Sequence, residues 1–418
     1  MYETLQPVAE DPILALMAGY RRDINPNKLD LGIGVYKDEQ GQTPIMQAVS
    51  SAERLLLEHE TSKSYIGPAG SEGFNRLIAQ LVFGADHRVI EEKRVVSAQT
   101  PGGCGALRIG AELLAACSPT GRIWVSDPTW ANHRPLLAGA GLEIREYPYY
   151  DAAQRSLRFD EMIETLNGAE AGDIVLLHGC CHNPTGADLE PDQWRQLAEL
   201  IERRGLLPFV DIAYQGLGDG LDQDAYGVRY LAERLPEMMV ATSCSKNFGL
   251  YRERTGALFL IGRTPAQTER AGGQLFSRIR GHYSMPPAHG GAVVETILGD
   301  AGLTGLWQSE LTAMRERIGY LRHRLVDRLE QAGVNGDFGH IRHQRGMFSF
   351  LGIEREQVVA LRKRHGIYLV ESGRFNVAGL SDRSIGSFVA ALAQTVGVSP
   401  DHDTPQGKHF DIRKTVEI

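Results

Sequence analysis

The sequence has no long hydrophobic run, no basic excess and no leader-like start. No apolar stretch reaches the roughly 18 residues that a membrane-spanning helix needs, so we expect no membrane partner. The first residues, MYETLQPVAEDP, carry acids but no basic and apolar regions, which argues against a signal peptide. Lysine and arginine number 44 against 52 acidic residues, a net charge of -8. This balance argues against a nucleic-acid partner but permits a local basic pocket for a small anion.

Cysteine is scarce as well. The five cysteines are an odd number and include no C-x-x-C pair, which argues against a disulfide framework and a zinc site. We therefore expect a reducing compartment, the cytoplasm. The pair Cys180-Cys181 reads as buried packing at a strand end. We assign no metal ion, because His182 has no ligand-like partner spacing.

Short apolar runs alternate with helical patterns along much of the chain. With 418 residues, 42% of them apolar, the chain suits two domains or one large domain with an annex. Helix-like segments such as 193–204 separate the runs, so we expect an α/β fold with a mainly parallel sheet covered on both faces. The expected strands are residues 122–126, 173–178, 207–210, 238–241 and 257–261.

The pattern changes from Leu311 onward. Apolar residues recur at steps of three and four from Leu311 to Leu329, which predicts a long amphipathic helix that ends near Gly333. We expect this helix to lead into a smaller C-terminal domain. The last stretch, residues 399–418, is polar and without period, and we interpret it as a loose tail.

Polar residues stand where several of the expected strands end. Asn183, Asp211 and Lys246 each follow or close such a strand, and Tyr214 comes soon after Asp211. Alone, each suits a turn or a cap. Ligands of parallel α/β sheets bind beyond the carboxyl ends of the strands, so together these residues predict a site that gathers an amine, a carboxylate, an amide and a phenol.

The surroundings of Lys246 indicate a particular chemistry. Burial or a neighbouring cation lowers the pKa of a lysine and frees its amine to form an imine. Arg254 and the hydroxyl of Ser243 suit a phosphate. An amine, a phosphate clamp and a carboxylate for a pyridine nitrogen are what pyridoxal phosphate requires. The glycine-rich stretch 100–107 could add backbone N–H groups at a helix start, although a plain tight turn explains it equally well.

These residues resemble the class I aminotransferases, and more closely the bacterial aspartate and aromatic-amino-acid aminotransferases. The matching motifs run in family order from about residue 11 to 398. They include LGIGVYKDE (31–39), QTPGG (99–103), DPTWANH (127–133), HGCCHNPTG (178–186), SCSKNFG (243–249), PPAHG (286–290), GMFSF (346–350) and SGRFNVAG (372–379).

The resemblance implies fold type I of the pyridoxal-phosphate enzymes. This fold has a large domain with a mostly parallel seven-stranded sheet between helices, and a smaller α/β domain built from both chain ends. The expected units are an N-terminal arm with part of the small domain at 1–43, the large cofactor domain at 44–312, the small domain at 313–398 and the tail.

The resemblance also implies catalytic roles. Lys246 would bond the cofactor and then move the proton, and Asp211 would pair with the pyridine nitrogen, with His133 behind it. Asn183 and Tyr214 would hold the cofactor's phenolic oxygen.

Further cofactor contacts are implied for the ring and the phosphate. Trp130 would stack on the ring. The phosphate would lie among Ser243, Arg254, Gly103, Cys104 and, from a second subunit, Tyr65.

The substrate contacts come from both subunits in this resemblance. Arg374 would grip the α-carboxylate, and Arg280 of a second subunit would meet a distal carboxylate. Gly34 would lie on the segment that closes over substrate, and Trp130 and Asn183 would also contact it. A homodimer with shared active sites is therefore expected.

One departure from the family pattern bears on the substrate. Met285 replaces the polar residue of many aspartate-preferring relatives and adds an apolar surface near Arg280. We therefore expect a ping-pong transaminase that moves the amino group of tyrosine, phenylalanine or aspartate to 2-oxoglutarate. A strict aspartate aminotransferase, or another pyridoxal-phosphate-dependent lyase or decarboxylase, is the alternative.

Overall fold

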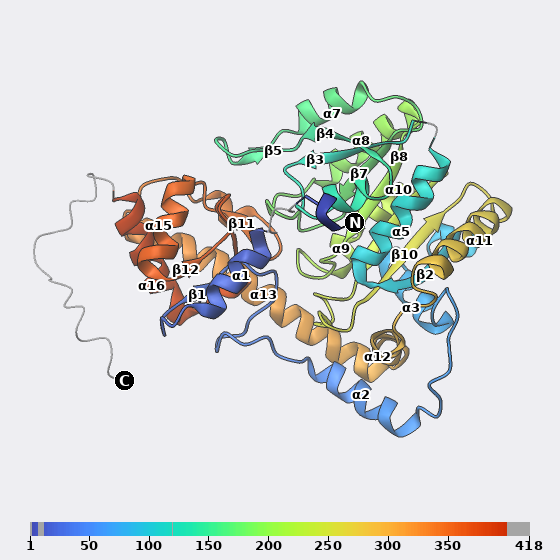
Figure 1. Cartoon of the computed structure of the whole chain (residues 1–418), viewed down its shortest axis with the longest axis horizontal. Helices are drawn as coiled ribbons and strands as arrows, with labels where there is room; N and C mark the ends of the chain where they lie inside the picture. The colour runs from blue at the N-terminus through green and yellow to red at the C-terminus, as the bar shows by residue number, and fades with distance from the viewer. Residues whose placement is uncertain (1, 7–11, 119, 399–418) are drawn as a thin grey trace, which may run out of the picture.

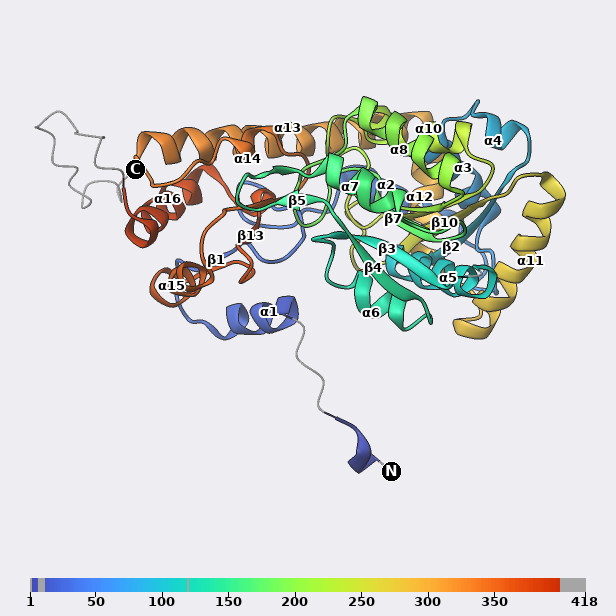
Figure 2. The same cartoon turned by 90° about the horizontal axis from the view of Figure 1, so that it is seen from above.

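The computed structural model describes residues 2–6, 12–118 and 120–398. Two units lie side by side and are joined by a long helix, α13 (Ala301–Gln331), which runs from one into the other (Figure 1). Figure 2 shows the same helix along one edge of both units. The stretch expected to form a polar tail, residues 399–418, lies outside the described residues.

The larger unit is built on one seven-stranded sheet. Strand β10 is antiparallel to both its neighbours, and the other pairings are parallel. The mostly parallel α/β sheet is thus confirmed. The sheet order is β2 (Val95–Pro101), β10 (Thr255–Ile261), β9 (Met238–Ser243), β8 (Leu207–Ile212), β7 (Ile174–His178), β3 (Arg122–Asp127) and β4 (Glu143–Pro148).

The side chains of the strands alternate between two apolar clusters, one on each face of the sheet. On β7, Val175 and Leu177 belong to one cluster, while Ile174 and Leu176 belong to the other. This is the two-residue period of a strand, and it explains why the runs are apolar throughout.

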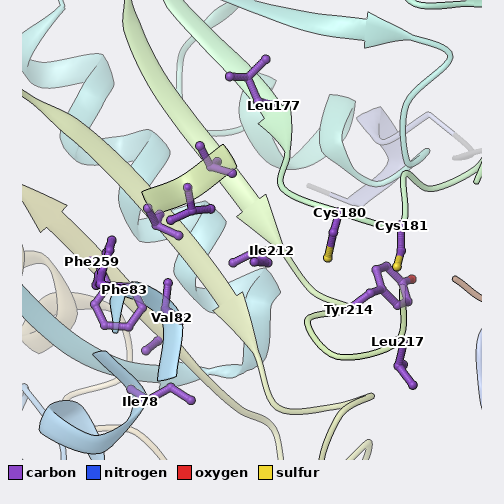
Figure 3. Packing of buried hydrophobic residues seen from close by; sticks show 14 of the residues in the cluster. Ile78, Val82, Phe83, Leu177, Cys180, Cys181, Ile212, Tyr214, Leu217 and Phe259 are labelled. Atoms are coloured by element: carbon purple, nitrogen blue, oxygen red, sulfur yellow. The ribbon is translucent and has the colours of Figure 1, made fainter. Parts of the chain in front are cut away.

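Helices cover both faces of the sheet. One face carries α2 (Gln47–His59), α3 (Glu72–Phe83), α4 (Arg88–Glu91), α7 (Phe159–Asn167), α8 (Pro191–Arg204), α9 (Leu221–Asp224), α10 (Tyr226–Arg234), α12 (Ala288–Gly299) and the first half of α13. The other carries α5 (Gly102–Cys117), α6 (His133–Ala138) and α11 (Pro265–His282). Figure 3 shows part of the first cluster, where Phe83 of α3 meets Phe259 of β10 edge to face with ring centroids 5.2 Å apart.

The smaller unit has its own apolar cluster. It unites Leu31 with the C-terminal half of α13 and with α16, although residues 31 and 392 are far apart in sequence. Its elements are α1 (Pro12–Arg22), β1 (Leu29–Asp30), α14 (His340–His343), β11 (Phe348–Phe350), α15 (Arg355–His365), β12 (Ile367–Tyr368), β13 (Arg374–Asn376), η2 (Val377–Gly379) and α16 (Asp382–Val396). The remaining elements are η1 (Tyr2–Thr4) and the hairpin of β5 (Tyr150–Asp151) and β6 (Ser156–Leu157). The exact domain boundaries stay a prediction.

The long helix ends near the expected residue but begins earlier. It starts at Ala301, ten residues before Leu311, because the Asp300 side chain accepts a hydrogen bond from Leu303 N at 2.8 Å and caps the first turn. Among the described residues, no helix is both long and apolar enough to cross a membrane.

Candidate active site

A cavity of about 270 Å³ lies beyond the carboxyl ends of β7, β8 and β9, where the two units meet. It gathers most of the residues predicted from the sequence, although they come from segments spread over 340 positions between residues 34 and 374. The predicted residues that line it are Gly34, Gly103, Cys104, Trp130, Asn183, Asp211, Tyr214, Ser243, Lys246, Arg254 and Arg374.

Two predicted residues lie elsewhere. Tyr65 is 91% exposed, and Arg280 is an exposed residue near the end of α11, where it contacts the Ser284 hydroxyl. Both were expected to act in the cavity of a second subunit. Their exposure on this chain is compatible with that role, which stays a prediction.

Lys246 occupies the centre of this site. It follows β9, and its Nζ lies 5.1 Å from the centroid of the Tyr214 ring. Burial lowers the pKa of the amine and Arg254 lowers it further, while Asp211 and Cys104 oppose this shift. The net direction is downward, so a larger share of the amine is free to act as a nucleophile and a base.

An anion pocket forms beside the lysine, where α5 begins. Gly102 has a φ of 70°, and a Cβ there would lie 2.6 Å from Arg254 Nη2. At Gly103 a Cβ would lie 3.2 Å from the Cβ of Ser243. Glycine therefore lets the start of this 16-residue helix approach the guanidinium and the hydroxyl closely. Helix N–H groups, an arginine and a serine together suit a phosphate group.

The backbone of Arg254 is itself unusual. Its φ of 52° lies in the left-handed region, which non-glycine residues rarely adopt. Its Nη1 donates to the carbonyl of Tyr251 at 3.2 Å. A strained residue held at a cavity wall is typical of a functional position.

A buried hydrogen-bond chain supports Asp211. His133 is fully buried, and its Nε2 lies 3.1 Å from Asp211 Oδ2. An ionised carboxylate only accepts, so His133 donates from Nε2. Its Nδ1 lies 2.8 Å from Thr129 Oγ1, which in turn lies 3.1 Å from His178 Nε2. Burial, with the charge of His133, lowers the pKa of His178 to about 3, so the chain ends on a neutral ring.

His178 was not among the predicted site residues. It is the last residue of β7, it lines the cavity, and it pairs in register with Asp211 on the neighbouring strand. The strand end was a usable signal, because the strand expected at 173–178 already ended at His178, as other predicted site residues end or follow their strands. His182 extends the buried group, with its ring centroid 4.0 Å from that of His178 and its Nε2 3.0 Å from Ser126 Oγ.

The smaller unit contributes a second guanidinium. Arg374 of β13 is buried, and it donates to Gly32 O at 2.7 Å and to Asn183 Oδ1 at 3.2 Å. Its Cζ lies 4.3 Å from the centroid of the Phe348 ring. A Cβ on Gly34 would lie 2.8 Å from Phe348 Cζ, so the segment packs tightly against this ring. A planar guanidinium held in this way suits a carboxylate.

The chain belongs to the family described as aminotransferase class I and II, whose model matches residues 26–392. It is 48% identical to the aspartate aminotransferase of Escherichia coli over 392 residues, 94% of this chain and 99% of that protein. It is 49% identical to the aromatic-amino-acid aminotransferase of Pseudomonas aeruginosa over 387 residues, 93% of this chain and 97% of that one.

A solved structure agrees in fold. The aromatic-amino-acid aminotransferase of Burkholderia pseudomallei, covalently bound to pyridoxal phosphate, superposes with a TM-score of 0.93 at 43% identity. The match covers 95% of this chain and 99% of that one. The predicted family and fold type are thereby confirmed.

Proposed function

We propose that this protein is a pyridoxal-phosphate-dependent transaminase. It moves the amino group of an aromatic or dicarboxylic L-amino acid to 2-oxoglutarate in two successive half-reactions. One observation carries the proposal: Lys246, an amine with a lowered pKa, lies in one cavity with an anion pocket and a second guanidinium. The aspartate and aromatic-amino-acid aminotransferases among its relatives support the same reaction.

The residues fit the cofactor on chemical grounds. Arg254, Ser243 and the start of α5 match a phosphate, Asp211 matches a protonated pyridine nitrogen, and Lys246 matches an aldehyde carbon. When bound, pyridoxal phosphate supplies an electron-withdrawing ring that stabilises the negative charge left when a Cα–H bond breaks.

Each side chain would then have a distinct task. Lys246 would hold the cofactor through its amine. Once the substrate's amino group has taken its place, that amine would accept the proton from the substrate Cα and deliver it to carbon C4′ of the cofactor. Asp211 would stabilise a positive charge on the pyridine nitrogen, and the hydrogen bond from His133 holds its carboxylate in place. Asn183 and Tyr214 would hold the cofactor's phenolic oxygen, and Trp130 would pack against its ring; all three line the cavity.

Arg374 selects the bond that breaks. We propose that it binds the substrate α-carboxylate with both ends of its fork and so turns the Cα–H bond toward Lys246. This arrangement favours transamination over decarboxylation, because the carboxylate is held away from the breaking position. Gly34 and Phe348 close the cavity around the substrate and limit water.

The proposed substrates include aromatic amino acids as well as aspartate. Met285 adds an apolar surface beside Arg280, and Arg280 retains a charge for distal carboxylates. Relatives with both preferences lie at similar identity, 48% and 49%. A strict aspartate aminotransferase is the alternative.

We propose that the protein is a homodimer, because Tyr65 and Arg280 do not line the cavity of their own chain and would act in that of a second subunit. Four large apolar residues on α2 or close to it in sequence are exposed on this chain, which agrees with a surface that a partner covers. They are Ile45, Leu55, Leu57 and Ile66. The cytoplasm remains the predicted compartment.

The test combines spectra with products. Aspartate, glutamate, phenylalanine and tyrosine are added separately to cofactor-loaded protein, and the absorbance of the cofactor and the 2-oxo acid formed are measured. We expect a spectral shift and an oxo acid with both substrate types. No shift with any of the four would refute transamination, and release of carbon dioxide would identify a decarboxylase.

A second readout does not depend on turnover. Borohydride reduction of the loaded protein should attach the cofactor to Lys246, as found by peptide mass analysis. Lys246→Ala should abolish the label, whereas Lys363→Ala, on an exposed site of α15, should leave it unchanged. A label at another lysine would contradict the assignment.

A further inference from the structure

A second cavity, of about 230 Å³, lies on the side of α13 that faces the larger unit. Its walls are the middle of α13, the loop at 217–219 that follows β8, and residues 342–346, which run from the end of α14 toward β11. It shares no lining residue with the active-site cavity. The volume is several times the roughly 30 Å³ that one water molecule occupies in the liquid.

The lining of this cavity is strongly basic, although the whole chain is acidic. Four arginines and two histidines face one carboxylate, that of Asp219. Arg345 pairs with Asp219 at 2.5 Å and with Glu190 at 3.1 Å. Arg342 pairs with two acids outside the cavity, Asp327 and Glu330.

The other two arginines make no ion pair within the part of the chain that the structure describes. Arg315 donates to the carbonyl of Gly216 at 3.1 Å and to the Thr312 hydroxyl at 3.3 Å, which are neutral acceptors. Among the described residues, Arg322 donates only to backbone carbonyls. Within this part of the chain, both guanidinium charges therefore remain without a carboxylate in contact.

Of these two arginines, Arg322 gives the stronger indication that the cavity holds a ligand. Its side chain is only 2% exposed, and burial lowers its pKa to about 10. The Nε atom is buried and finds no hydrogen-bond partner among the described residues. A buried charge with an unused donor is costly unless an opposite charge or an acceptor meets it. Such a group in a native protein calls for an explanation, and a bound ion is one.

We propose that this cavity binds a small oxyanion of the phosphate type between Arg315 and Arg322. Guanidinium groups match the oxygens of a tetrahedral anion, and the anion would supply the missing acceptor and charge. The ligand enters from solvent past His323 and His343, both of which are exposed.

The site is connected to the catalytic wall through the backbone. Arg322 Nη2 donates to the carbonyls of Gly346 and Phe348, each at 2.7 Å. The ring of Phe348 packs against the guanidinium of Arg374 and against Gly34. A bound anion that fixes Arg322 thus also fixes the strand that positions Phe348. This coupling rests on the proposed function, whereas anion binding does not.

Inorganic phosphate is the probe, titrated by calorimetry into cofactor-saturated protein so that the cofactor's own phosphate pocket is filled. Arg315→Gln removes one proposed ligand without touching the active-site cavity. Arg324→Gln is the matched control, because Arg324 is on the same helix but contacts Asp382 outside the cavity. We expect Arg315→Gln to weaken binding about tenfold or more, the loss of one charge-assisted hydrogen bond, and Arg324→Gln to leave it unchanged.

Equal affinities in the wild type and both variants, or no binding, would overturn the site. A titration with sulfate in place of phosphate shows whether the cavity recognises any tetrahedral dianion or phosphate alone. Binding of either anion supports an oxyanion site.

The KM for the amino donor is then measured with and without phosphate. A KM shift of about twofold or more that disappears in Arg315→Gln supports the coupling, and an unchanged KM refutes it. Phosphate binding without any transamination would refute the proposed function and leave the site intact.

Discussion

A buried tryptophan packs against the loop that carries Lys246. Trp307 of α13 is fully buried, and its Nε1 donates to the carbonyl of Asn247, the residue after Lys246, at 2.7 Å. Its ring stacks on Phe248 with centroids 4.5 Å apart and planes 4° from parallel. Trp307 therefore fixes the loop that presents the reactive amine.

The substitution Trp307→Phe keeps the stack but removes the donor. A buried carbonyl left without its partner costs about 1–3 kcal/mol. The smaller ring adds about 1–2 kcal/mol through lost burial and an incompletely filled space. We expect the free energy of unfolding to fall by about 2–5 kcal/mol, measured by urea denaturation with circular dichroism at one fixed protein concentration.

The functional result should be specific to the loop. A displaced amine lowers kcat by about ten- to a hundredfold, with a smaller change in KM, because the substrate contacts stay in place. The control is Trp124→Phe, since Trp124 Nε1 donates to Asp173 Oδ2 at 2.8 Å at the opposite end of the strands. That variant should lose stability but keep kcat. An unchanged kcat in Trp307→Phe, or an equal loss of kcat in both variants, would refute the reasoning.

Three more outcomes are expected. His178 is buried, which lowers its pKa from the ordinary 6.5 to about 3. Between pH 6.5 and pH 3, His178 is therefore protonated in the unfolded chain but neutral in the folded chain. Stability should therefore fall as pH drops below about 6.5, and thermal unfolding at pH 5 and pH 7.5 should show a smaller difference in His178→Gln. Gly186→Ala should destabilise the protein by several kcal/mol in denaturant titrations, because φ there is 72° and the new Cβ would lie 2.4 Å from the carbonyl oxygen of Phe348. Lys246→Ala should reduce single-turnover rates by about 10²–10⁴-fold or more, since it removes the general base, and Lys246→Arg should not restore them.

Much of the fold was readable from local patterns. Five strands of the large sheet and the end of α13 followed from apolar runs and from three- and four-residue spacing. Strands β2 and β4 were not among the expected strands, because β2 runs through polar Ser97, Gln99 and Thr100 and β4 is rich in charged residues. The position of β10, antiparallel between β2 and β9, is a property of pairing that a single run does not encode.

Some residues of the candidate site could be predicted from the sequence and others could not. Residues that follow strand ends, such as Asn183 and Lys246, could be placed from the chain order, because parallel strands deliver their ends to one edge of the sheet. Arg374 and Gly34 entered only through the resemblance, since nothing near them in sequence indicates a shared wall. The link from Asp211 to His178 through His133 and Thr129 is visible only in the tertiary structure.

The sequence by itself therefore determined which segments form strands and which polar residues stand at their ends, since these depend on neighbours along the chain. Only the tertiary structure decided which charges are buried. Burial lowers the pKa of Lys246, and it leaves Arg322 Nε without a hydrogen-bond partner among the residues that the structure describes. Both effects depend on atoms from distant segments closing around one group and excluding water, and no local pattern records that.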